Sequence, residues 1–180
     1  MPLSPPAPRE HIHSRDIAVR GYRRADGLWD IEAHMRDTKT YGFPNKARGT
    51  IEAGEPIHDM WLRITIDEHY VIVAAEASTE AAPFTICGDI TPAFAGLKGL
   101  HLGPGWRRAV RERVGGVHGC THLVELLGPI ATVAYQTLVT ATTQKPRDKD
   151  KPPRHLDSCH ALDRNGPVVH EHYPEFYTGA

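Results

Sequence analysis

The chain has 180 residues, of which 40% are hydrophobic and 24% charged, a composition typical of one soluble globular domain. Its 21 basic and 22 acidic residues give a formal net charge of -1, which argues against a nucleic-acid-binding protein. No apolar run approaches the roughly 20 residues that span a bilayer, and the first residues lack the basic and apolar segments of a secretory signal. We therefore expect a cytoplasmic protein without a nucleic-acid or membrane partner.

The first half of the chain has the alternating pattern of β-strands. After a proline-rich lead, residues 16–39 predict two strands joined at Asp26-Gly27, a dipeptide that favours a tight hairpin turn. A loop rich in glycine and proline follows over residues 40–56. Residues 57–79 predict a second pair of strands that turn near residues 67–69. We expect these hairpins to form an antiparallel sheet.

The second half of the chain has the spacing of helices. Apolar residues recur every three or four positions in three segments, residues 91–100, 104–114 and 121–139. The charged, proline-rich segment 143–155 is typical of a linker, and a short strand is expected in the extension 156–180. A sheet followed by packed helices predicts an α+β fold.

The numbers of histidines and cysteines indicate what kind of functional site to expect. The chain has 12 histidines, an unusually large number that points to metal binding or proton chemistry. Its 3 cysteines are odd in number and none lies in a CxxC pair, which fits a reducing compartment better than a disulfide framework.

The stretch "GGVHGCTHLVELLGP" places three reactive side chains at the predicted start of the last helix. Cys120 directly precedes this helix, where free backbone N–H groups favour a negatively charged sulfur that binds metal or acts as a nucleophile. His122 and Glu125 follow and lie near the same helix end, where either could carry a proton. The alternative is that Thr121 caps the helix while Cys120 and His122 only pack against the sheet.

Further candidate ligands lie at a strand start and at the turn into the helices. Strand alternation places His58 in the row of Met60, Leu62, Ile64 and Ile66, and it places Asp59 on the other face. Cys87 lies at the junction between sheet and helices. One nitrogen and two sulfurs from His58, Cys87 and Cys120 suit zinc or iron, which leaves a position for Asp59, His122 or water. The long, irregular spacing makes this motif less specific than a CxxC pair.

The order of these residues resembles that of iron-sulfur scaffold proteins of the NifU and IscU type. Those proteins have a small antiparallel sheet followed by helices, with ligands before a strand, at the sheet-to-helix turn and at the start of the late long helix. Here "IHDMWLRITID", Cys87 in "TICGD" and Cys120 in "VHGCTHL" occupy the matching places. The chain departs from the scaffold pattern because Pro56 or Ile57 stands where a scaffold has its first cysteine. It also offers fewer sulfurs and adds segments at both ends that suit a substrate pocket.

Longer stretches are similar to a bacterial family of domains of unknown function. They are "MPLSPPAPRE", "GYRRADGLWDIEAHMRDTKTY", "GEPIHDMWLRITID" and "GCTHLVELLGP". This resemblance implies membership of that family and, through bacteria that degrade aromatic compounds, an aromatic catabolic substrate.

The patterns and the resemblances together predict one α+β domain over residues 1–180. Its expected parts are a lead over 1–14, an N-terminal hairpin and loop over 15–54, a NifU/IscU-like core over 55–142, a charged linker over 143–155 and a C-terminal extension with a strand over 156–180.

The leading functional hypothesis is a small metal-dependent lyase or hydrolase that acts on a small organic molecule. Zinc or ferrous iron is the expected cofactor, with His58, Asp59, Cys87 and Cys120 as candidate ligands and with His122 and Glu125 as candidate catalytic residues. One alternative is an iron-sulfur or zinc scaffold, and another is a metal-free cysteine enzyme. The sequence leaves open a homodimer and the roles of Cys159, His160, His170 and His172.

Overall fold

The structure is a computed structural model that describes residues 3–142, 151–153 and 155–179. The chain divides into two compact units, Met1–Thr142 and Thr143–Ala180. The predicted single domain stays a prediction, because two compact units can still unfold as one. Most of the predicted linker, residues 143–155, lies outside the described residues.

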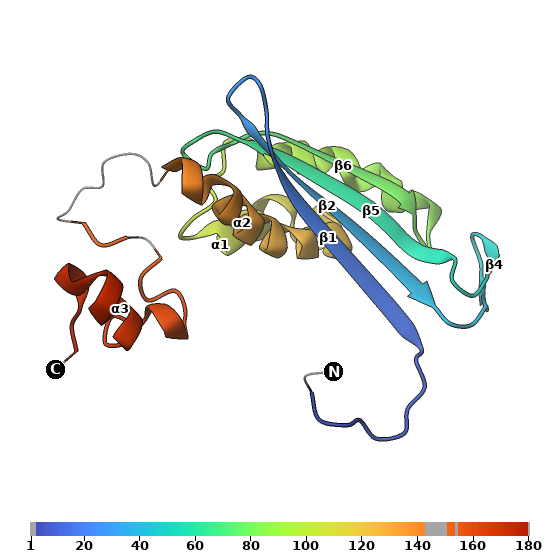
Figure 1. The fold of residues 1–180 in the computed structure, drawn as a ribbon. Coiled ribbons are helices and arrows are strands. Elements are labelled where there is room, and N and C mark those ends of the chain that lie inside the picture. Colours follow the sequence, from blue (N-terminus) through green and yellow to red (C-terminus); the bar gives the residue numbers. More distant parts are fainter. Residues whose placement is uncertain (1–2, 143–150, 154, 180) are drawn as a thin grey trace. The chain divides into compact units, whose positions relative to one another are not determined.

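The first unit is built on a four-stranded antiparallel sheet with the strand order β1-β2-β5-β6 (Figure 1). Its strands are β1 (His13–Arg23), β2 (Trp29–Lys39), β5 (Pro56–Ile66) and β6 (Ile72–Ala81). A small separate hairpin, β3 (Phe43–Asn45) and β4 (Gly49–Ile51), lies in the connection between β2 and β5. The predicted antiparallel sheet is therefore confirmed.

The tight turns of the sheet follow from their residues. Between β1 and β2, Gly27 has a φ of 86°, which side chains other than glycine rarely tolerate. The Asp26 side chain accepts a hydrogen bond from the backbone N–H of Leu28 there. Between β5 and β6, Asp67 accepts backbone N–H bonds from His69 and Val71. Both predicted hairpin turns are thus confirmed.

Helices follow the sheet along the chain. They are the 3-10 helix η1 (Thr85–Leu97), α1 (Trp106–Val114), the short 3-10 helix η2 (Gly116–His118) and α2 (Thr121–Thr142). The second and third predicted helices match α1 and α2, whereas the first, residues 91–100, overlaps the end of the 3-10 helix η1. No helix among the described residues is long and apolar enough to cross a membrane.

The core lies between one face of the sheet and the helices (Figure 1). The sheet contributes the alternating rows expected from the sequence, Trp29, Ile31, Ala33 and Met35 from β2 and Met60, Leu62, Ile64 and Ile66 from β5. Helix α2 contributes a row at helical spacing, Leu123, Leu126, Leu127, Ile130, Ala134 and Leu138. This packing fixes the start of α2 over one end of the sheet.

The second unit contains a helix where the sequence predicts a strand. Residues Pro167–His172 form α3, with Pro167 at the first helical position, flanked by the 3-10 helices η3 (His160–Leu162) and η4 (Pro174–Phe176). The expected C-terminal strand is therefore wrong. Proline fits the first turn of a helix because its φ is already helical and its missing N–H would have no partner there. Leu156, Val169 and Phe176 form a small core of this unit.

Candidate functional site

Three neighbouring strands bring polar side chains together at one end of the sheet. In the strand register, Arg15 of β1 lies opposite Asp37 of β2, and Asp37 lies opposite His58 of β5. Directly opposite residues share a face of an antiparallel sheet, so all three side chains belong to the helix-covered face. Asp37 continues the buried row of β2 and is only 1% exposed.

The Asp37 carboxylate is the centre of this group. Arg15 donates to both of its oxygens, from Nε at 2.8 Å and from Nη2 at 2.7 Å. His58 Nδ1 lies 2.8 Å from Oδ2, and His13 Nε2 lies 3.5 Å from Oδ1. Burial raises the pKa of Asp37, but the hydrogen bonds from Arg15 and His58 outweigh it and lower this pKa below its ordinary value. The carboxylate is therefore held in its charged form.

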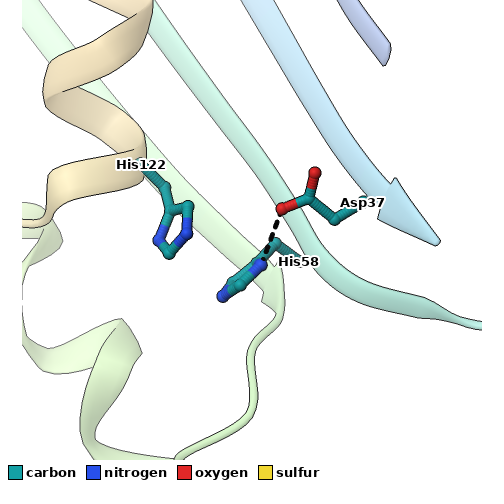
Figure 2. A group of neighbouring side chains, drawn as sticks. All are labelled: Asp37, His58 and His122. Atoms are coloured by element: carbon teal, nitrogen blue, oxygen red, sulfur yellow. Dashed lines mark hydrogen bonds and ion pairs between the residues drawn. The ribbon is translucent and has the colours of Figure 1, made fainter. Parts of the chain in front are cut away.

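The start of α2 places His122 against this group. The rings of His58 and His122 lie with their centroids 3.8 Å apart and their planes at 33° (Figure 2). Burial lowers the pKa of His122, and its interactions with His58 and Arg15 lower it further, which outweighs the opposite effect of Asp37 and Glu125. A neutral imidazole is the form that binds a metal.

Asp37, His58 and His122 form a candidate metal site. Each offers one ligand atom, and these atoms lie within 4.8 Å of one another. Among the residues that the structure describes, this is the one group of three histidine, cysteine or acidic side chains with that spacing. His58 and His122, both predicted from the sequence, are thus brought together.

Two further predicted residues border the group. Cys120 directly precedes α2, and its Sγ lies 4.0 Å from His122 Nδ1, so it contacts the site without belonging to the group of three. Glu125 lies one turn further along α2. Its Oε2 accepts a hydrogen bond from Arg15 Nη1 at 2.5 Å, and its side chain is 48% exposed.

The structure does not bring Asp59 or Cys87 to this group. Asp59 lies on the opposite face of β5 from His58, because neighbouring residues of a strand point to opposite sides. There its Oδ1 lies 2.7 Å from His34 Nε2. Cys87 is half-buried in η1, and its backbone N–H bonds to the carbonyl of Phe84. Their assignment as ligands finds no support in this geometry and stays a prediction.

Sequence reasoning missed Asp37 and Arg15. The sequence pattern could have indicated Asp37, because this residue continues the alternation of Ala33 and Met35 and so places a carboxylate in a buried row of the strand. No sequence pattern indicates Arg15, since its role depends on the register between β1 and β2, which the pattern does not specify.

Comparisons with known proteins give one match. A model of a protein family of unknown function, DUF2889, matches residues 13–136, and this range includes Arg15, Asp37, His58 and His122. No curated protein and no solved structure matches the chain. The likeness to NifU and IscU scaffolds accordingly stays a prediction, although the α+β order of sheet and helices is confirmed.

Proposed function

The chain belongs to the DUF2889 family of proteins of unknown function, and from its site we propose that it is a small metal-dependent enzyme. Asp37, His58 and His122 hold one zinc or ferrous ion in this proposal. The reaction is a hydrolysis or a lyase step on a small organic molecule.

The proposal rests on the metal-ligand atoms that this group brings together. Two imidazoles and one carboxylate converge from β2, β5 and α2 with ligand atoms within 4.8 Å. Ligand atoms around a tetrahedral zinc lie roughly 3.3 Å apart when each metal bond is 2.0–2.1 Å long. Small side-chain rotations therefore suffice to bring the three ligand atoms to this spacing.

The number of ligands favours catalysis over a structural role. Catalytic zinc sites use three protein ligands and keep one position open, and two histidines with one carboxylate also bind non-haem ferrous iron. A metal bound there polarises a substrate oxygen or activates water. His122 then serves as a ligand rather than as the predicted proton carrier, and Glu125, at the edge of the site, keeps that predicted role.

The electrostatics of the group agree with metal binding. Arg15 holds Asp37 ionised, and burial keeps His122 neutral. Both are the forms that a metal requires. Hydrogen bonds to a ligating carboxylate also fix its orientation, which is the role we assign to Arg15.

Metal analysis of protein purified without a His tag tests this proposal. We expect the wild type to bind close to one zinc ion, and His58→Ala and His122→Ala to weaken zinc binding by more than about 100-fold, beyond the usual effect of residues outside the ligand set. His34→Ala is the matched control, because His34 lies near the same end of the sheet but bonds to Asp59. The proposal is wrong if the wild type binds neither zinc nor ferrous iron, or if His34→Ala weakens metal binding as much as His58→Ala and His122→Ala do.

A metal-free acid–base enzyme is the second candidate. It is favoured by the 2.8 Å contact between Asp37 and His58 Nδ1, since an ionised aspartate that orients a histidine leaves Nε2 to take a proton. This candidate predicts that chelators leave turnover unchanged. The scaffold has less support, because no cysteine belongs to the group of three. The cysteine enzyme rests on the single 4.0 Å contact between Cys120 Sγ and His122 Nδ1.

A further inference from the structure

We infer that the site accepts a small carboxylic acid, whose carboxylate replaces that of Glu125 on Arg15. The inference rests on the proposed function, since the acid would lie beside the metal held by Asp37, His58 and His122. It adds a substrate class and a residue that recognises it.

The guanidinium of Arg15 has a second edge, now bound by Glu125, that suits such a ligand. It carries five N–H donors in a fixed plane. Asp37 takes one from Nε and one from Nη2, which anchors one side of the guanidinium. The remaining donors lie on the edge formed by Nη1 and Nη2, where Glu125 binds Nη1. An edge with two parallel donors matches the two oxygens of a carboxylate.

The two carboxylates on Arg15 are held very differently. Asp37 is 1% exposed and receives two bonds from Arg15 and one from His58, so it stays in place. Glu125 is 48% exposed and ends on a long side chain, and such surface ion pairs contribute little stability. Asp37 thus holds the Arg15 guanidinium in place, whereas Glu125 is easily displaced from it. A guanidinium that is already ordered lowers the entropic cost of binding an acid there.

The charge of the site favours an anion once the metal is bound. Asp37 and Glu125 carry negative charges, and Arg15 carries a positive one, so these three leave one negative charge. A bound divalent metal would change the net charge of this group from one negative to one positive charge. An incoming carboxylate that displaces Glu125 then faces both the metal and Arg15.

Exposed apolar side chains border the same end of the sheet. Val117, 90% exposed, lies in the connection from α1 to α2, just before His122. Phe84 and Ile86, 66% and 69% exposed, follow the end of β6, whose last residue pairs with Asp59 beside His58. Exposed apolar groups beside a polar site are typical of binding surfaces. They favour an acid with an apolar body over a short polar one.

Benzoate serves as the probe, with benzamide and acetate as comparisons, and calorimetry on the zinc-loaded protein gives the dissociation constants. We expect benzoate to bind more tightly than acetate, and benzamide not to bind because it lacks the charge. Glu125→Gln should tighten benzoate binding about two- to fivefold, because it removes the competing carboxylate. Arg15→Lys should weaken it roughly tenfold, since lysine lacks the planar pair of donors.

Asp16→Asn is the matched control. It changes the net charge by the same amount as Glu125→Gln, but Asp16 lies next to Arg15 on the opposite, exposed side of β1. It should leave benzoate binding unchanged. The inference is overturned if Glu125→Gln tightens binding no more than Asp16→Asn does, or if benzamide binds as well as benzoate. This variant pair decides the matter even where Arg15→Lys fails to fold.

The two proposals fail in different ways. If zinc binding depends on His58 and His122 but Glu125→Gln leaves the benzoate affinity unchanged, the proposed carboxylate binding by Arg15 is wrong and the proposed metal site is retained. If the protein binds no zinc but Glu125→Gln still tightens benzoate binding to the metal-free protein, the proposed metal site is wrong and the proposed carboxylate binding by Arg15 is retained.

Discussion

Asp37 is the residue on which the candidate site depends. It is the one ionisable side chain buried below 2% exposure among the described residues, and a buried charge is costly unless it is paired and hydrogen-bonded. Arg15 and His58 supply those bonds. The same contacts that stabilise the fold at this point also orient the carboxylate of the candidate site, so we expect stability and the proposed metal binding to be coupled through Asp37.

Removal of Arg15 should expose this coupling. In metal-free protein we expect Arg15→Ala to lower the free energy of unfolding by about 1–3 kcal/mol, because it leaves the buried Asp37 carboxylate short of two hydrogen bonds. The value is below that for a fully buried pair because the Arg15 side chain is 30% exposed. Urea denaturation measures it, with Arg20→Ala, an exposed residue of the same strand, as the control. Equal effects of the two substitutions would contradict the role given to Arg15.

At the scale of elements, the position of α2 on the sheet decides where His122 lies. β1 and α2 approach each other closely at Gly21, since a Cβ added there would lie 1.9 Å from Thr137 Oγ1 of α2. The Thr137 hydroxyl is itself bonded to the carbonyl of Val133. The glycine thus allows β1 and α2 to pack together, and this contact keeps the helix close to the strand that carries Arg15.

A side chain at position 21 should separate these two elements. Glycine inside a strand usually costs stability relative to alanine, but here we expect Gly21→Ala to destabilise by about 1–3 kcal/mol through overpacking. Thermal or urea unfolding measures the change. Gly21→Ala combined with Thr137→Ala should recover part of it, because the nearest atom in the clash is the Thr137 hydroxyl. A stabilised Gly21→Ala protein would contradict this account of the packing.

Sequence patterns predict the elements well and the site only in part. Alternation identified the buried rows of β2 and β5, and the helical spacing identified α1 and α2. His122 and His58 were found because each lies at the end of a predicted element. Arg15 was not found, because strand register depends on pairing between distant segments. The C-terminal strand was wrong because six residues are too few to distinguish alternation from one short helix.

At the scale of the whole molecule, the first compact unit contains every residue of the candidate site. The family match over residues 13–136 also falls within it. The second unit, Thr143–Ala180, has its own small core of Leu156, Val169 and Phe176. The contacts described above for the sheet, its helices and the candidate site therefore involve no residue beyond Thr142.

A chain that ends at Thr142 should fold and bind zinc. We expect its zinc affinity to match that of the full chain within about twofold. Its melting temperature should lie within about 2–4 °C, the shift that corresponds to about 1 kcal/mol in a domain of roughly 150 residues. Circular dichroism and metal analysis measure both. An insoluble or unfolded truncated chain would contradict this expectation and would favour the single domain predicted from the sequence.

The long separations within the site have a consequence for the order of folding events. Asp37 and His58 lie 21 residues apart in the sequence, and Arg15 and Glu125 lie 110 residues apart. Contacts between such distant segments form only after the loops between them have closed, at a cost in chain entropy. The unfolded chain thus presents no concentrated set of ligands, and we do not expect the proposed metal ion to nucleate folding. In the proposed metal site, an ion would bind only after the hydrophobic core has brought Asp37, His58 and His122 together.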